Sequence, residues 1–169
     1  MGAPAVQPDL DALVGLLCWR CLPGVGTCFT AELGAPILKS RERCSPRSCA
    51  RYGSPHRCVD LEGSVRLWAY CCDWTLLREG APIGSGGDPH EVMTDRLGAL
   101  QGSRVRSLSY SAPAWSLELD SGFVAEMTQS CTTESDAVAY VTLGATRWLS
   151  LMPDGRVLDE SPDTPPGGP

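Results

Sequence analysis

Four residues with metal-binding side chains lie within fifteen positions of this 169-residue chain, and they are Cys44, Cys49, His56 and Cys58. Thiolate and imidazole groups are the ligands of structural zinc, and four of them complete a tetrahedral site. Metal binding would also order a segment that is otherwise too polar to fold. The spacing matches no standard zinc motif, so we favour a loop without a cofactor and keep zinc as the alternative.

The same segment is strongly basic. Its cations are Lys39, Arg41, Arg43, Arg47, Arg51 and Arg57. Only Glu42 opposes them, so residues 39–57 carry +5 and the rest of the chain −11, for a net charge of −6. Such a loop favours an acidic partner or a phosphate. Tyr52 is the one aromatic residue among the arginines, which disfavours nucleic acid. We therefore expect a protein partner, contacted by Arg41, Arg43, Arg47, Arg51 and Arg57.

Catalytic patterns are missing from the sequence. The two histidines are His56 and His90, and the chain contains no G-x-S-x-G, P-loop or H-E-x-x-H motif. The glycine-rich stretch at residues 84–87 precedes an expected helix and could hold an anion, but it lacks the Lys-Ser/Thr of a phosphate loop. We expect the protein not to be an enzyme.

Cys18-x-x-Cys21 has the spacing of a redox or zinc pair. On a regular strand, however, residues three apart point to opposite faces, and so do the neighbours Cys71 and Cys72. The total of nine cysteines is odd, and the N-terminal residues do not resemble a secretory signal. We therefore expect a cytoplasmic protein in which most cysteines are buried as small hydrophobic residues.

The elements that must position these residues are mostly strands. Residues 27–33 and 115–120 alternate apolar and polar side chains, and residues 123–127 follow the second of these after a turn. A hairpin is expected over residues 148–158, where Pro153-Asp154-Gly155 forms the turn. One helix is expected to begin with Asp88 as its N-cap and to bury a partial apolar face of Val92, Met93, Leu97 and Leu100.

The chain also divides into two related halves, 9–87 and 88–160. Gly15 and Gly102, and likewise Trp74 and Trp148, occupy similar places in the two halves. Residues 39–58 are an insertion in the first half, 1–8 a flexible leader and 161–169 a disordered tail. The expected fold class is α+β and β-rich: one compact domain of antiparallel sheets built from two degenerate repeats, either sandwich-like or barrel-like. Without a long apolar run, no membrane association is expected.

Two sets of motifs resemble those of small uncharacterised bacterial proteins. The motifs are Gly24-x-Gly26-Thr27-x-Phe29 with Tyr70-Cys71-Cys72-Asp73-Trp74 in the first half, and Trp115-x-Leu117 with the 148–158 hairpin in the second. The pattern of strand and turn residues in these motifs is also similar to that of β-rich immunity-type proteins, which neutralise toxins. The resemblance implies a similar fold and no known active site. The function that we expect is a non-enzymatic, cytoplasmic bacterial protein-binding module, with partner neutralisation of the immunity type as its specific form. The alternatives are a zinc- or anion-stabilised ligand-binding module and an enzyme of unrecognised type.

Overall fold

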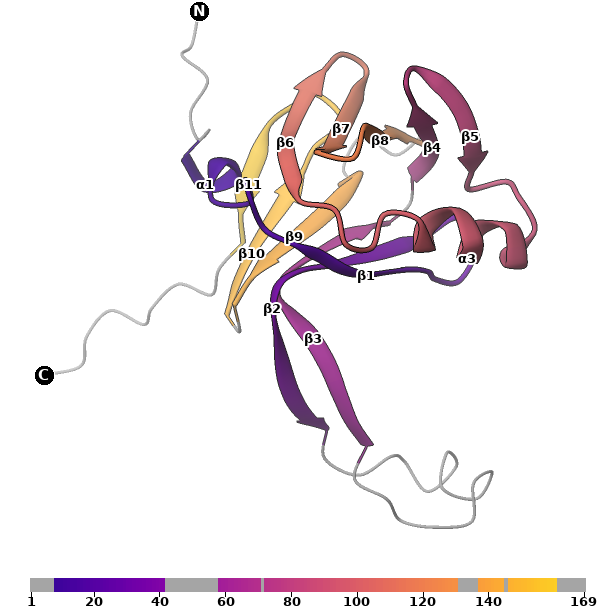
Figure 1. The fold of residues 1–169 in the computed structure, drawn as a ribbon. Helices are drawn as coiled ribbons and strands as arrows, with labels where there is room; N and C mark the ends of the chain where they lie inside the picture. Colours follow the sequence, from indigo (N-terminus) through magenta and orange to yellow (C-terminus); the bar gives the residue numbers. More distant parts are fainter. Residues whose placement is uncertain (1–7, 42–57, 71, 131–136, 145, 161–169) are drawn as a thin grey trace, which may run out of the picture.

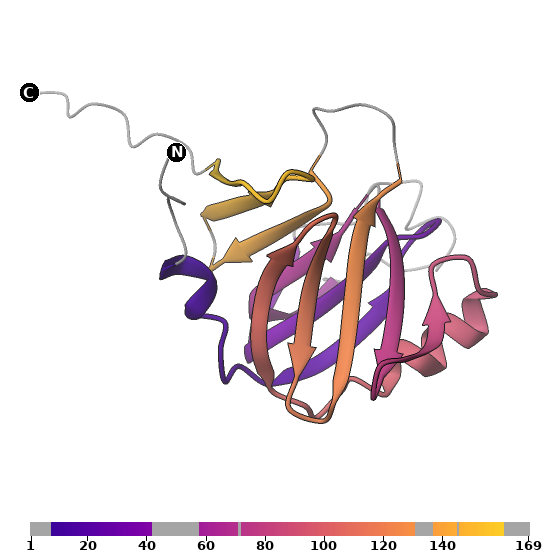
Figure 2. The same cartoon turned by 90° about the horizontal axis from the view of Figure 1, so that it is seen from above.

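The computed structural model describes residues 8–41, 58–70, 72–130, 137–144 and 146–160. Two open antiparallel sheets pack face to face in these residues (Figure 2). The six-stranded sheet has the order β1-β2-β3-β9-β10-β11 and the five-stranded sheet the order β5-β4-β8-β7-β6. The expectation of a β-rich fold with antiparallel sheets is confirmed, and the barrel-like alternative is wrong, because both sheets keep free edges.

Each half of the chain contributes strands to both sheets. The first half supplies β1 (Cys18–Pro23), β2 (Phe29–Arg41) and β3 (Cys58–Ala69) to the six-stranded sheet, then β4 (Cys72–Arg78) and β5 (Ala81–Ser85) to the other. The second half supplies β6 (Val105–Ser111), β7 (Ala114–Leu119) and β8 (Phe123–Gln129) to the five-stranded sheet. It then returns to the six-stranded sheet with β9 (Ala139–Leu143), β10 (Arg147–Leu151) and β11 (Val157–Asp159).

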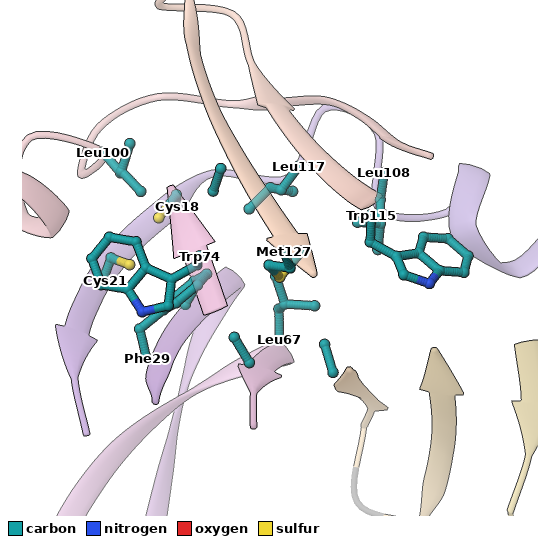
Figure 3. Close-up of a cluster of buried hydrophobic side chains, with 14 of the residues drawn as sticks. Cys18, Cys21, Phe29, Leu67, Trp74, Leu100, Leu108, Trp115, Leu117 and Met127 are labelled. Atoms are coloured by element: carbon teal, nitrogen blue, oxygen red, sulfur yellow. The ribbon is translucent and has the colours of Figure 1, made fainter. Parts of the chain in front are cut away.

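The core lies between the two sheets. Alternate residues of β4, β7, β8 and β9 point into it, as the period-two pattern requires. Phe29 and Leu67 come from the six-stranded sheet, and Trp74, Leu117 and Met127 from the five-stranded sheet (Figure 3). The indole of Trp74 meets the edge of Phe29 at a centroid distance of 5.4 Å. Its Nε1 donates a hydrogen bond to the carbonyl oxygen of Thr27, which satisfies its polar group inside the core.

Within the residues that the structure describes, two helices lie beside the sheets, the short α1 (Pro8–Asp11) and α3 (His90–Gly98). Met93 and Leu97 of α3 are buried, as the sequence predicts, but Val92, predicted for the same face, is 38% exposed. The predicted N-cap is wrong: Pro89 occupies that position, and the side chain of Asp88 accepts a hydrogen bond from the Ser85 amide instead. No helix in the described ranges is long and apolar enough to cross a membrane.

Strands β2 and β3 extend past the sheet as a two-stranded ribbon, which we call the arm and which comprises residues 35–41 and 58–63 (Figure 1). The pairing register shifts between Leu33 and Pro36, and a bulge of this kind bends a ribbon. Gly34 has a φ of 76° at this bend. A Cβ on Gly63 would come within 2.5 Å of the Leu33 carbonyl oxygen, so the bend requires glycine there as well.

Candidate functional site

The outer face of the six-stranded sheet carries four aromatic side chains, and we call it the aromatic face. Trp68 lies near the end of β3 and Tyr70 directly after it, Tyr140 lies across from Trp68 on β9, and Trp148 lies on β10. The ring centroid of Trp68 lies 4.7 Å from the ring centroid of Tyr70 and 5.9 Å from that of Tyr140. Tyr70 and Trp148 remain 39% and 43% exposed. Large apolar rings therefore reach solvent on one side of the molecule.

The strand register aligns this face in two cross-strand rows. One row runs Leu22, Thr30, Trp68, Tyr140, Ser150, Leu158. The neighbouring row runs Arg20, Glu32, Arg66, Thr142, Trp148. Because directly paired residues of antiparallel strands point to the same side, the second row places an acid between two arginines next to the aromatic row.

Glu32 is buried, and its carboxylate is fully engaged. Oε1 accepts a hydrogen bond from Arg66 Nε at 2.8 Å and lies 2.7 Å from Arg66 Nη2. Oε2 accepts a hydrogen bond from the Gly63 amide at 2.7 Å, and Arg20 Nη2 lies 3.6 Å from Oε1. Buried charges in proteins are paired in this way because an isolated one is costly.

A second buried acid extends the network into the arm. Glu62 Oε1 lies 3.2 Å from Arg66 Nη2, and Glu62 Oε2 lies 2.5 Å from Lys39 Nζ. Burial opposes the charge of Arg66, but the hydrogen bonds and charges of Glu32 and Glu62 outweigh it and leave the pKa of the guanidinium raised. We call Arg20, Glu32, Lys39, Glu62 and Arg66 the ion-pair network.

The bend of the arm creates a hollow of about 250 Å³ over the aromatic face. Its lining includes Lys39 from the arm, Arg66 from the network, and the rings of Trp68, Tyr140 and Trp148. A second hollow of about 260 Å³ adjoins it and shares Thr30 and Arg66. Small-molecule pockets usually measure roughly 300–1,000 Å³. Each hollow lies just below this range and has room for a side chain or two.

The residues proposed from the sequence fall mostly outside the described residues. Of the metal candidates, Cys44, Cys49 and His56 lie in residues 42–57, and Cys58 is described only as the first residue of β3. Arg43, Arg47, Arg51 and Arg57 also lie in 42–57, and Arg41 is described only as the last residue of β2. The metal hypothesis and the arginine-loop hypothesis remain untested.

Further predictions concern the two ends of the chain and the insertion. The predicted tail 161–169 and residues 1–7 of the predicted leader lie outside the described residues, and Pro8 is the first residue of α1. The predicted insertion 39–58 is strand at both ends, because β2 continues to residue 41 and β3 starts at residue 58. Lys39, expected in a basic loop, instead forms an ion pair on the arm. His90 is exposed in the first turn of α3.

The expectation that strand alternation separates Cys18 from Cys21 is wrong. The register of β1 against β2 shifts between Cys18 and Arg20, and this extra residue turns both thiols into the core (Figure 3). A hydrogen bond between the two thiols lowers the pKa of Cys18 and, together with burial, raises the pKa of Cys21. The pair is closed to external ligands, so the expectation that these cysteines act as small core residues is confirmed.

Sequence reasoning missed the aromatic face and the ion-pair network. A signal was present at the end of β3 and directly after it, where Arg66, Trp68 and Tyr70 recur with the period of two that places residues on one face of a strand. The contributions of β9 and β10 lie about seventy residues further along the chain, and only strand pairing brings them alongside. Searches against protein-family models, curated proteins and solved structures find no match for this chain.

Proposed function

We propose that this protein is a non-enzymatic protein-binding module that holds its partner on the aromatic face. The observation that carries the proposal is the gathering of two tryptophans and two tyrosines on one outer surface beside Arg20 and Arg66. Trp, Tyr and Arg are the residues that dominate binding energy at protein interfaces. Trp and Tyr supply large contact areas and lose little conformational entropy on binding.

The opposite outer surface supports the proposal by contrast. One of its cross-strand rows runs Thr75, Glu126, Ser116, Ser109. The next runs Leu77, Val124, Glu118, Ser107. These described rows of the five-stranded sheet contain no aromatic residue and suit a surface that remains solvated. The aromatic face is therefore a local feature of one sheet and not a general property of the surface.

A binding role fits the titratable groups better than a catalytic one. Both buried acids, Glu32 and Glu62, are held by cations, and His90 is exposed on α3 away from the two hollows. A general acid or base needs a group poised in a cleft at a suitable pKa. We infer a cytoplasmic bacterial protein of the immunity type, which would neutralise its partner by covering it.

We also propose that the two halves are diverged repeats. Each half places three consecutive strands in one sheet and then crosses to the other sheet, which supports this proposal. Hydrogen bonds that recur in the two halves support it as well. The Gly86 amide donates to the Trp74 carbonyl in the first half, and the Glu160 amide donates to the Trp148 carbonyl in the second. Gly15 and Gly102 also share a left-handed φ, 83° and 89°. On this proposal, only one of the two duplicated faces acquired aromatic residues.

Site-specific photo-crosslinking tests the binding face directly. A benzophenone amino acid replaces Trp148 in one variant and Val92, which is comparably exposed on α3, in the control. Both variants are irradiated in the native cells, and crosslinked proteins are identified by mass spectrometry. We expect one partner to be captured through position 148 and not through position 92. Equal capture from both positions would contradict the proposed face.

The captured partner is then purified and titrated against the intact protein by calorimetry. Trp148→Ala and Tyr70→Ala should each weaken binding by about tenfold or more, as loss of an interface hot spot does, and Val92→Ala by less than twofold. If the Trp148→Ala/Tyr70→Ala double variant keeps its affinity, the proposal fails. Stoichiometric protein should also abolish the partner's activity; binding without inhibition would remove the immunity-type role alone.

A further inference from the structure

The charges of the ion-pair network are unequally accessible. Among the described residues, three cations surround two carboxylates, and these five groups together carry a charge of +1. The side chains of the acids Glu32 and Glu62 are 4% and 7% exposed. The side chains of the cations Arg66 and Lys39 are 26% and 46% exposed. An approaching group therefore meets nitrogen donors, while the acids are covered by their own partners.

Donors remain for an incoming group. The ammonium of Lys39 has three N–H bonds, and one is directed at Glu62 Oε2. In the described part of the chain, Arg66 uses Nε and Nη2 for the two acids, and no hydrogen bond involves its Nη1. Lys39 and Arg66 line the same hollow as Trp68, Tyr140 and Trp148. The hollow thus combines the cationic hydrogen-bond donors of Lys39 and Arg66 with the apolar rings of the aromatic face.

We propose that the hollow receives a carboxylate side chain of the partner, flanked by an apolar or aromatic residue that packs on Trp68 and Trp148. This proposal rests on the proposed function and specifies the chemistry of the partner's anchor. The carboxylate would accept hydrogen bonds from Lys39 and Arg66, and charge-assisted bonds of this kind are among the stronger ones. A hollow of about 250 Å³ suits such a pair of side chains.

Other occupants fit less well. A lysine or arginine of the partner would find both acids of the network already covered and would meet two cations. Single-stranded nucleic acid could stack on the rings, but its affinity comes chiefly from several phosphate contacts. The hollow offers two cations, and the chain as a whole carries −6. The chemistry therefore favours an acidic peptide segment.

A phage-displayed library of random twelve-residue peptides tests this inference with the immobilised full chain. Clones that also bind Trp148→Ala are removed. We expect the remaining clones to share Asp or Glu within three positions of Trp, Tyr, Phe or Leu. Synthetic copies in which this acid is replaced by its amide should bind at least tenfold more weakly.

Substitutions at Lys39 provide the matched comparison. Lys39→Glu should weaken the selected peptides at least tenfold, and Lys39→Arg should retain binding within threefold, because it keeps the charge. Arg106→Glu makes the same charge change on exposed β6 of the other sheet and should have no effect. Urea unfolding confirms that each variant is folded, so that a loss of binding reports on the hollow.

The outcomes separate this inference from the proposed function. Clones that depend on Trp148 but are basic or uncharged would overturn the acidic anchor and leave the binding face standing. The absence of any Trp148-dependent clone would count against both. A labelled twenty-nucleotide oligouridylate that binds as tightly as the selected peptides, and in a Lys39-dependent way, would replace the acidic peptide with nucleic acid.

Discussion

Removal of the Arg66 guanidinium tests whether the ion-pair network holds the base of the arm to the sheet. Arg66→Met keeps a long apolar side chain but takes away the contacts at 2.7, 2.8 and 3.2 Å with Glu32 and Glu62. Both carboxylates stay buried, because their strands are fixed by backbone pairing. A buried acid without its cation is expensive, so the variant should be clearly less stable.

The magnitude follows from what remains around the two acids. Loss of one member of a buried ion pair costs about 3–5 kcal/mol. Glu32 keeps the Gly63 amide and the more distant Arg20, and Glu62 keeps Lys39. We therefore expect a loss at the lower end, about 3 kcal/mol. For a chain of this length, that lowers Tm by about 6–12 °C.

The assay is urea unfolding followed by tryptophan fluorescence, with a matched control. Arg147 and Asp159 also lie 2.7 Å apart, but both side chains are more than a third exposed. Arg147→Met should therefore cost less than about 1 kcal/mol. Adding Glu32→Gln to Arg66→Met should recover part of the loss, because the buried charge disappears. An equal loss in the two arginine variants would refute the reasoning.

Three further predictions concern the core and the turns. Leu67→Ala, which empties a fully buried position between the sheets, should lower the free energy of unfolding in urea by about 3–5 kcal/mol; a loss below about 1 kcal/mol would show that the sheets close over the gap. Gly155 and Gly122 both have left-handed φ values, 85° and 83°, but only at Gly155 would a Cβ strike a neighbour, the ring of Tyr110. Gly122→Ala should therefore cost about 1 kcal/mol and Gly155→Ala about 1–3 kcal/mol more, and equal Tm shifts would contradict this. Because the pKa of Cys21 is raised in the folded protein, the unfolded chain loses that proton first as the pH rises. Stability should then fall above about pH 9, and Cys21→Ala should flatten this fall relative to wild type; an unchanged slope in the pH series of unfolding curves would argue against the raised pKa.

Local patterns predicted the elements whose stability depends on neighbours in sequence. The hairpin at residues 148–158 forms because Pro153 and Gly155 specify its turn, and the strand at 115–120 follows from simple alternation. Local patterns failed where a single extra residue changes the direction of side chains. The bulge in β1 is not visible in the sequence, and it turns Cys18 and Cys21 to the same side of the strand instead of to opposite sides.

The candidate site was hardly predictable, because it is assembled across strands. Glu32 and Arg66 pair directly, although they lie thirty-four positions apart. Tyr140 reaches Trp68 only because β9 pairs with β3 in one register, and a shift of one residue would turn its ring into the core. Nothing in the order of residues states which strands become neighbours.

The sequence by itself determined that the chain is rich in antiparallel strands and that a helix follows Pro89, since alternation, turn residues and the apolar positions of a helix act over a few residues. It also determined that residues 39–57 are a basic segment, with five arginines and one lysine against one acid. Only the tertiary structure decided that four aromatic rings share one outer face and that two buried acids sit beneath exposed cations. The reason is physical: the burial of a side chain and the neighbours of its charge depend on strand register and sheet packing, which are set by the whole chain.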